Sequence, residues 1–225
     1  MASLKELLKT KLIPKIMEEV KDCNPGEFMR IEHSKVGVCG LSCRLCPSYY
    51  IQGASRCGGC KSEIRMTVGC PFITCAVKRK GIEFCWDCID SETCDKWRGH
   101  REIGKKSDTF KCYQKLENNI DFIEKNGVAE FEKQQKIREK LLKGMLQEFN
   151  EGRSKRYYCI AATVLEIGEI RAALSEAKER SKGLGLKEKS RILHSILDAL
   201  AARKNYFLKL RKRRKSIWKR LIILF

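Results

Sequence analysis

The chain has 225 residues, of which 43% are hydrophobic and 33% are charged, and it carries a formal net charge of +19. This length allows one or two compact domains, and this composition excludes a chain that is disordered throughout. No run of apolar residues approaches the roughly 18 that cross a bilayer, which excludes a conventional transmembrane helix.

Residues 1–38 are predicted to form a helical lead. Ser3 and Glu6 can make a capping box at the start of an amphipathic helix. Short strands are expected only at Met29–Ile31 and Val36–Val38. The first residues lack the apolar stretch of a secretory signal, so we expect a cytoplasmic protein.

A cysteine-rich module is predicted over residues 39–95, because ten of the thirteen cysteines fall there. Three pairs are separated by two residues, a spacing that lets both sulfurs of a tight turn face one ion. Disulfides are not expected, since the cysteine count is odd and no secretory signal precedes them. The candidate metal ligands are Cys39, Cys43, Cys46, Cys57, Cys60, Cys70, Cys75, Cys85, Cys88 and Cys94.

These thiolates suffice for two four-coordinate sites, and we expect two zinc ions as cofactors. Structural zinc can contribute on the order of 10–16 kcal/mol per site, which matters in a region with few large apolar side chains. An interleaved pairing fits nearly as well as the preferred one. The preferred pairing puts Cys43, Cys46, Cys57 and Cys60 on one ion and Cys70, Cys75, Cys85 and Cys88 on the other, with Cys39 and Cys94 as replacement ligands.

An iron–sulfur cluster is the alternative cofactor, because four thiolates also suit iron. The triplet Cys39-x3-Cys43-x2-Cys46 has the spacing used by radical enzymes that bind a cluster and S-adenosylmethionine. The helical remainder of the chain argues against that class. Cys85-Trp-Asp-Cys88 could be a redox pair, although a zinc-binding turn is favoured since no βαβ pattern surrounds it.

The order and spacing of the cysteines resemble the family known as domain of unknown function 3795. The resemblance implies metal binding through these cysteines and implies no particular reaction. The family pattern ends in Phe-Pro-Cys, whereas this chain has Glu-Thr-Cys94. The likeness rests on Cys39-Gly-Leu-x-Cys43-x-x-Cys46-Pro-x-Tyr49, Cys57-x-Gly-Cys60, Cys70-x4-Cys75 and Gly81-x-x-Phe84-Cys85-x-x-Cys88.

The polar stretch from Lys96 to Ser107 predicts a linker before a helical half, residues 108–225. Within that stretch, Gly99–Lys106 nearly matches a phosphate loop but lacks the final Ser or Thr and the preceding strand. We therefore favour a solvated linker there.

Apolar periodicity predicts several helices in the helical half. The first is capped by Asp108 and ended by Gly127, the second covers 128–149 with Ile137 facing inward, and the last begins at Leu186. One or two helices are expected over 157–181, divided around Gly168. The predicted fold class is mainly α with minor β, a cysteine-rich metal-binding module followed by this helical half.

Basic residues gather in two places. Arg153, Lys155 and Arg156 lie just before a helix and could bind an anion there, or form an ordinary basic loop. The tail 203–225 carries ten basic residues and no acidic one. It could bind RNA or DNA phosphates, lie on an anionic membrane surface, or pack on the protein. Its densest run is Arg211, Lys212, Arg213, Arg214 and Lys215.

The sequence thus predicts a metal-binding protein, with zinc as the expected metal, whose basic half engages nucleic acid or another anionic partner. An iron–sulfur redox or radical protein and a peripheral membrane protein are the alternatives. No pair of acids and no Ser with a recognisable base stands out, which favours a protein that is not an enzyme. His33 or His100 could complete a metal site, and the oligomeric state does not follow from the sequence.

Overall fold

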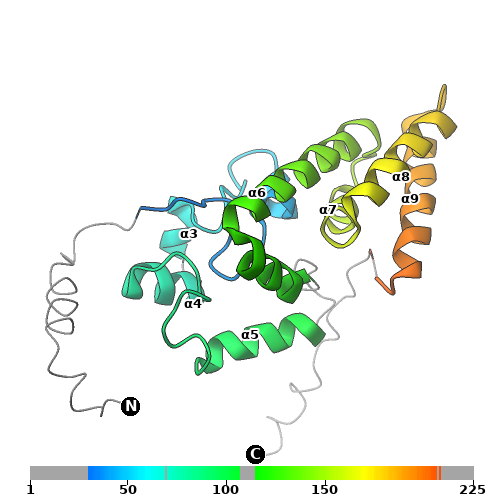
Figure 1. Cartoon of the computed structure of the whole chain (residues 1–225). Coiled ribbons are helices and arrows are strands. Elements are labelled where there is room, and N and C mark those ends of the chain that lie inside the picture. Colours follow the sequence, from blue (N-terminus) through cyan, green and yellow to red (C-terminus); the bar gives the residue numbers. More distant parts are fainter. Residues whose placement is uncertain (1–29, 69, 107–114, 207, 209–225) are drawn as a thin grey trace, which may run out of the picture. The chain divides into compact units, whose positions relative to one another are not determined.

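The computed structural model describes residues 30–68, 70–106, 115–206 and 208 (Figure 1). The chain divides into two compact units, Met1–Arg30 and Ile31–Phe225. The lead helix predicted from Ser3 lies outside the described residues, as does Met29 of the strand predicted at Met29–Ile31. Arg30 and Ile31 are described and are not in a strand. The cysteine-rich module and the helical half belong to the same unit, the second.

This second unit is mainly helical, as the sequence predicts. A strand at Val36–Val38 is not formed, because the β pairing among the described residues is a single isolated bridge between Val36 and Ser42. None of the helices in the described ranges is long and apolar enough to cross a membrane. The elements are η1 (Cys43–Leu45), η2 (Pro47–Tyr50), α3 (Glu63–Val68), α4 (Pro71–Ile73), the π turn η3 (Thr74–Arg79), α5 (Asp95–Lys106), α6 (Leu116–Glu148), α7 (Lys155–Val164), α8 (Ile167–Arg180) and α9 (Leu186–Arg203).

Helices α6 to α9 pack around one hydrophobic core. Met145 of α6, Tyr158 of α7, Ile170 of α8 and Leu193 of α9 are all completely buried in it. Gly183, with φ of 74°, supplies the left-handed turn after α8, and α9 returns beside α8 (Figure 1). This core is the main source of hydrophobic stabilisation in the helical half.

Helix boundaries follow the sequence at one glycine and depart from it at another. Gly127 has φ of 82° and ψ of 159°, which interrupts α6 where the sequence predicts the end of a helix. Two helices form over 157–181, one of the two predicted alternatives, but the break lies at the extended residues Leu165 and Glu166, and Gly168 itself is in the first turn of α8. Leu165 is drawn into the core and Glu166 caps α8. Ile137, expected to face inward, is 42% exposed.

The cysteine-rich module has a smaller apolar core, which includes Val38, Leu41, Ile73 and Trp97. Trp97 belongs to α5, so the linker predicted over Lys96–Ser107 is wrong: a helix occupies this stretch as far as Lys106. The physical reason is that Trp97 is only 3% exposed and anchors the polar helix on the module.

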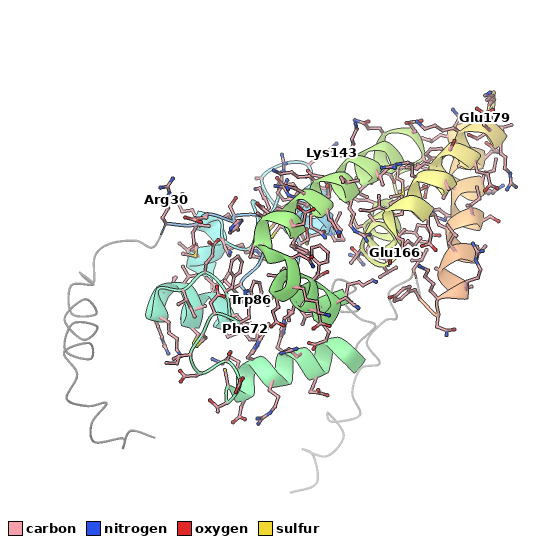
Figure 2. The ribbon with its side chains drawn as sticks, viewed as in Figure 1. Arg30, Phe72, Trp86, Lys143, Glu166 and Glu179 are labelled. Carbon is pink, nitrogen blue, oxygen red and sulfur yellow. The ribbon has the colours of Figure 1, made fainter. Side chains whose placement is uncertain are left out.

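Apolar side chains also join the module to the helical half. Leu116 and Ile120, at the start of α6, complete the core of the module, and Leu45 of η1 enters the core of the helical half. Trp86 stacks on Phe84 with 4.4 Å between ring centroids and packs close to α6 (Figure 2). The turns that carry the cysteines are thereby fixed against α6.

Candidate metal centre

Tight turns carry the first cysteines. The amide of Gly37 donates to the Leu41 carbonyl at 2.8 Å and closes a turn that contains Cys39. Gly40 in this turn has φ of 82°, and a Cβ there would lie 3.2 Å from Ile120, so only glycine suits the position. The loop therefore approaches α6 closely before the chain reaches Cys43.

Cys43 and Cys60 are in direct contact. The Cys60 amide donates to the Cys43 sulfur at 3.2 Å. The Cys60 thiol also donates to this sulfur and, with the ammonium groups of Lys35 and Lys61, lowers the pKa of Cys43 to about 7 despite its burial. The same contact and burial raise the pKa of Cys60. Cys43 thus has the environment of a thiolate.

Cys46 and Cys57 lie near this pair. Burial raises the pKa of Cys46, and the charge of Cys43 adds to the effect. The Arg65 guanidinium donates to the Cys57 sulfur, and the charges of Cys60 and Cys46 also raise the pKa of Arg65. We call Cys43, Cys46, Cys57 and Cys60 the first thiol group, which is the set predicted for one ion.

A second group surrounds Cys85, which is 9% exposed. Burial, and then the charges of the neighbouring Cys39, Cys75, Cys94 and Cys88, raise the pKa of Cys85 to about 12. Cys75 lies in the π turn η3, which directly follows α4. We call Cys75, Cys85, Cys88 and Cys94 the second thiol group, which differs from the preferred pairing in that Cys94 takes the place of Cys70.

A cation also reaches the second thiol group. The Lys80 ammonium donates to the Cys88 sulfur at 3.0 Å and to the Asp90 carboxylate. Cys88 therefore has a charge-assisted partner, as Cys57 has in Arg65.

Cys39 has neighbours in both groups, Cys43 in the first and Cys85 in the second, and Cys70 lies near it. Burial raises the pKa of Cys39 to about 12, and the charges of both Cys70 and Cys43 contribute. A Cβ on Gly37 would lie 3.7 Å from the sulfurs of Cys39 and of Cys60, so these two sulfurs flank the same glycine. Several of the predicted ligands are thus electrostatic neighbours of one another, and the pairing of thiols with ions stays a prediction.

The donor chemistry fits a thiolate-bound metal ion. Every cysteine in the described ranges is a free thiol, and sulfur donors suit zinc and iron. In the part of the chain that the structure describes, however, no three Cys, His, Asp or Glu side chains surround one point closely enough to hold an ion. The sulfurs are gathered without forming a tetrahedral site.

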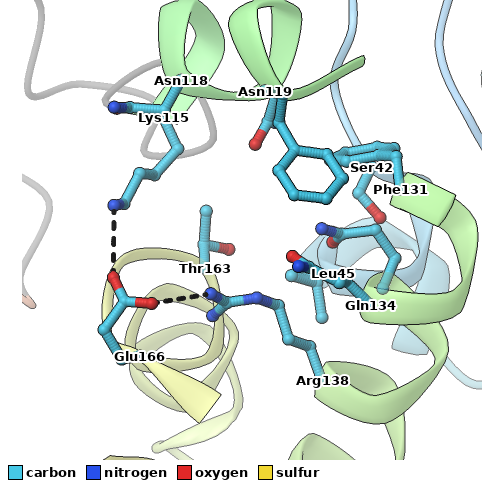
Figure 3. Close-up of a pocket in the computed structure, with 12 residues that line it drawn as sticks. Ser42, Leu45, Lys115, Asn118, Asn119, Phe131, Gln134, Arg138, Thr163 and Glu166 are labelled. Atoms are coloured by element: carbon cyan, nitrogen blue, oxygen red, sulfur yellow. Dashed lines mark ion pairs between the residues drawn. The ribbon is translucent and has the colours of Figure 1, made fainter. Parts of the chain in front are cut away.

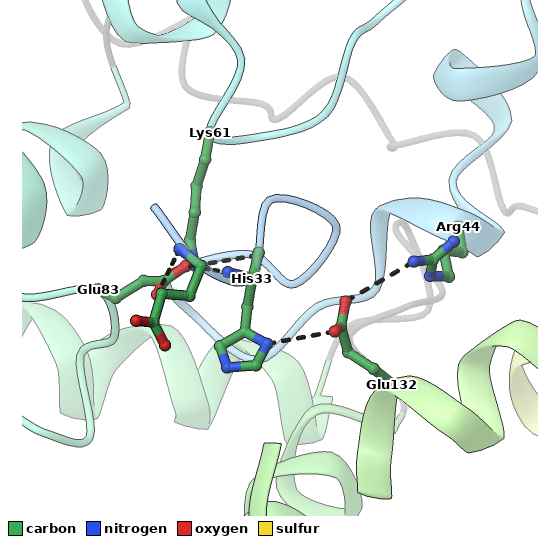
Figure 4. Close-up of polar contacts among 6 residues, drawn as sticks. His33, Arg44, Lys61, Glu83 and Glu132 are labelled. Atoms are coloured by element: carbon green, nitrogen blue, oxygen red, sulfur yellow. Dashed lines mark hydrogen bonds and ion pairs between the residues drawn. The ribbon is translucent and has the colours of Figure 1, made fainter. Parts of the chain in front are cut away.

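A chain of polar contacts fixes the first thiol group against α6 (Figure 4). The buried Lys61 ammonium donates to Glu83 at 2.6 Å, and Glu83 accepts from the His33 amide at 2.8 Å. The His33 ring in turn contacts Glu132 of α6 at 3.2 Å, and Arg44 lies 3.7 Å from the same carboxylate. His33 thus serves this network.

His100, the other histidine considered as a ligand, stacks among aromatic rings. Its ring lies 4.5 Å from that of Phe72 and 5.8 Å from that of Trp97, measured between centroids. Burial lowers the pKa of His100, which favours its neutral form. Its position in the module is explained by packing.

The predicted anion site before α7 is largely occupied by the protein itself. The Lys155 ammonium donates to the Tyr50 carbonyl at 3.3 Å. Glu151 accepts from the Ser190 hydroxyl at 2.9 Å, so a carboxylate already lies at this loop. Arg153 and Arg156 are exposed. The run Arg211–Lys215 lies outside the described residues.

A serine–histidine pair is present that the sequence does not reveal. The Ser154 hydroxyl and His194 Nε2 lie 2.8 Å apart, and the Tyr157 ring stacks on His194 with 3.9 Å between centroids. Ser154 is only 2% exposed, so a substrate has no access to its hydroxyl. The pair joins α7 to α9, and no local signal could have identified two residues 40 positions apart.

Comparison with protein-family models, with curated proteins and with solved structures gave no match for this chain. The resemblance to the domain of unknown function 3795 family therefore stays a prediction that rests on the cysteine spacing.

Proposed function

We propose that residues 39–94 form a thiolate module that binds two zinc ions and is stabilised by them. The observation that carries this proposal is the gathering of ten cysteines, spread over 56 residues, onto turns with little regular secondary structure. So small an apolar core gives limited stability, and the free energy of zinc binding stabilises the folded state directly.

The surroundings of the sulfurs support the same proposal. Amide and cationic donors contact the sulfurs of Cys43, Cys57 and Cys88. Such donors stabilise thiolates and orient metal ligands. The zinc supplies the attraction that keeps eight or more sulfurs deprotonated and close together. The chain contributes the donors, the turns and the packing of these turns on α6.

Binding requires the sulfurs of each thiol group to turn toward a common point. Cysteine has one side-chain torsion before its sulfur, and rotation about it moves the sulfur without moving the backbone. The raised pKa values of Cys39 and Cys85 belong to buried thiols without a metal, and a bound ion would displace their protons. Metal uptake should therefore release protons and weaken in acid.

The test is the metal content of anaerobically purified protein, measured by elemental analysis. We expect two zinc ions per chain and a colourless preparation. Cys57→Ser should lower the zinc content, whereas Cys159→Ala, which removes a cysteine buried in the α6–α9 core, should leave it at two. A brown, iron-containing preparation would establish the iron–sulfur alternative, and a folded metal-free protein would overturn both.

We further propose that the basic tail binds the phosphates of RNA or DNA in the cytoplasm. The support is its charge, since residues 203–225 contribute ten of the basic groups and no acidic one. Phosphate binding by so many cations depends steeply on salt. The predicted second contact at Arg153, Lys155 and Arg156 is reduced to its two exposed arginines, because Lys155 is engaged by Tyr50.

Fluorescence anisotropy with a labelled single-stranded RNA tests this second proposal. Replacing the five cations of Arg211–Lys215 by Gln should abolish binding and flatten its salt dependence. The matched control replaces five exposed cations of the α8–α9 region, Lys178, Arg180, Lys182, Lys187 and Arg191. Equal loss of binding in the two sets would show that RNA binding depends only on the net charge of the protein. Binding of the tail to anionic vesicles but not to RNA would favour the membrane alternative.

A further inference from the structure

A cavity of about 120 Å³ lies where the cysteine-rich module meets the helical half (Figure 3). Ser42 and Leu45 come from the module, Thr163 comes from α7, and Glu166 caps α8. Most of the remaining wall belongs to α6. The cavity is separate from the two thiol groups, and nothing in the proposed metal-binding function uses it.

The charged groups of the wall satisfy one another. Arg138 donates to the carbonyls of Ala162 and Leu165 at 2.9 and 2.5 Å. The Glu166 carboxylate lies 3.7 Å from the Arg138 guanidinium and 3.8 Å from the Lys115 ammonium (Figure 3). Since each charge has a partner, the cavity offers no unpaired cation to an anion.

The uncharged polar groups of the wall, in contrast, include several without a hydrogen-bond partner. The Ser42 hydroxyl is buried and has no hydrogen-bond partner, and the residue is 7% exposed. Within the described ranges, the side-chain amides of Asn118, Gln134 and Gln135 also make no hydrogen bond. Each amide presents a donor and an acceptor to the cavity. Buried polar groups normally have partners, so the orphaned Ser42 hydroxyl points to a ligand. Asn118 is exposed and Gln134 is half-buried, so their amides are open to a ligand or to water.

Two aromatic rings form an apolar side of the cavity. Phe122 and Phe131 lie 6.3 Å apart between centroids at 48°, so they do not form a parallel slot. Phe131 is 2% exposed, whereas Phe122 is half-buried. A planar ligand would therefore stack on Phe122, with its edge toward the amides.

We propose that this cavity binds a neutral, planar heterocycle with hydrogen-bond donors and acceptors on its edge, of the size of one pyrimidine base. An engineered cavity of roughly 150 Å³ holds benzene, so the volume suits a single six-membered ring. Asn and Gln side chains recognise base edges by paired hydrogen bonds, and aromatic side chains stack on base faces. The internally paired charges favour a neutral ligand over a carboxylate or phosphate.

Isothermal titration calorimetry of the full-length protein with uracil and cytosine tests this proposal. We expect one saturable site for at least one of the two bases. Benzoate has a similar ring and a charge, and toluene has the ring without polar groups, so both should bind at least tenfold more weakly. No saturable binding of either base, or equal binding of toluene, would overturn the proposal.

Variants locate the site. Gln134→Leu and Ser42→Ala should each weaken base binding by about tenfold, because each removes hydrogen-bonding groups of the wall. Gln147→Leu changes an exposed amide of the same helix outside the cavity and should leave the affinity unchanged. Phe122→Leu keeps the apolar bulk but removes the ring, and it should weaken binding without unfolding the protein. Affinity unchanged in all three wall variants, with melting curves like that of the unaltered protein, would exclude this cavity as the site.

The base could reach the cavity free or as part of a strand, and competition separates these sources. If uridine and a short oligouridylate displace uracil equally per base, the site takes free bases or nucleosides. If the oligonucleotide displaces uracil at a much lower concentration, the base enters as part of a strand. The metal content of the same samples reports on the zinc proposal separately, so either proposal can fail alone.

Discussion

Arg44 donates a hydrogen bond of 2.8 Å to Glu139 and so fastens the turn between Cys43 and Cys46 to the middle of α6. The two side chains are only 17% and 11% exposed, so this ion pair is screened far less than one on the surface. The contact links the turn that carries Cys43 and Cys46 to α6, the longest of the described helices.

Removing this contact should destabilise the protein. Arg44→Met leaves the buried Glu139 carboxylate with Lys143, at 3.0 Å, as its remaining cation. We expect the free energy of unfolding, measured by urea denaturation, to fall by about 1–3 kcal/mol.

The matched control is Arg180→Met, which removes an exposed partner of Glu176 on α8. Its cost should stay below about 1 kcal/mol, as for most surface pairs. Equal losses of unfolding free energy in the two variants would show that the Arg44–Glu139 pair stabilises the protein no more than a surface pair does.

Gly59→Ala should damage the first thiol group. Gly59 has φ of 116°, and a Cβ there would lie 3.2 Å from the Ser34 carbonyl oxygen and 3.8 Å from the Cys43 sulfur. The substitution strains the turn that brings Cys60 to Cys43, and we expect a loss of at least about 1 kcal/mol. Zinc content should fall in the same variant.

Gly99→Ala is the control for this substitution. Gly99 lies in α5 with open space around its Cβ position, and alanine favours a helix interior. This variant should gain up to about 1 kcal/mol and keep its zinc. A Gly59→Ala protein with unchanged stability and zinc content would contradict the geometry of the turn.

Local signals in the sequence predict the helices and the grouping of the cysteines, because both depend on residues close together in the chain. Leu193 and Met145 are buried where the apolar period places them. The exceptions depend on contacts with distant residues. The polar α5 is held by one buried tryptophan, Trp97, and the break before α8 follows from the burial of Leu165.

The candidate site likewise has parts that the sequence predicts and parts that depend on distant contacts. The spacing predicts Cys43 and Cys60 as neighbours, and the structure places them in contact. The cations beside the sulfurs, Lys80 and Arg65 among them, carry no motif that would predict their partners. The cavity at Ser42 is formed by segments far apart in the chain, so only the folded structure reveals it.

Lys61 and Glu83 form an ion pair in which each charge is stabilised by the other. The Lys61 side chain is completely buried, its ammonium lies 3.9 Å from the Phe84 ring centroid, and it donates to Glu83. Glu83→Gln leaves this ammonium without a carboxylate and should cost about 3–5 kcal/mol at pH 7. The double variant Lys61→Met with Glu83→Gln should recover much of this loss.

The cost of Glu83→Gln should also depend on pH. Burial opposes ionisation of Glu83, but the Lys61 ammonium and the His33 amide outweigh it and hold the pKa of Glu83 below its ordinary 4.5. The stabilisation is therefore complete above pH 4.5 and is lost as the pH falls through the folded-state value. Urea denaturation of the two proteins from pH 7 to pH 3 should show their stability difference narrowing in acid. A stability difference that stays constant from pH 7 to pH 3 would contradict an ion pair between Lys61 and Glu83.

Metal removal should unfold the module and spare the helical core. The α6–α9 core contains no residue of either thiol group, so its packing does not require zinc. The module has only a smaller apolar core, so loss of on the order of 10 kcal/mol per zinc site should unfold it.

Hydrogen exchange after chelation with EDTA measures this difference. The amides of Cys85 and Gly37, bonded to Val38 and Leu41 at 2.8 Å, should lose protection. The Tyr158 amide, bonded to the Ser154 carbonyl at 2.9 Å in α7, should keep it. Added zinc should restore the lost protection and added magnesium should not, since magnesium prefers oxygen ligands. Protection that survives chelation throughout the module would mean that apolar packing and the contacts with α6 alone hold the cysteine turns.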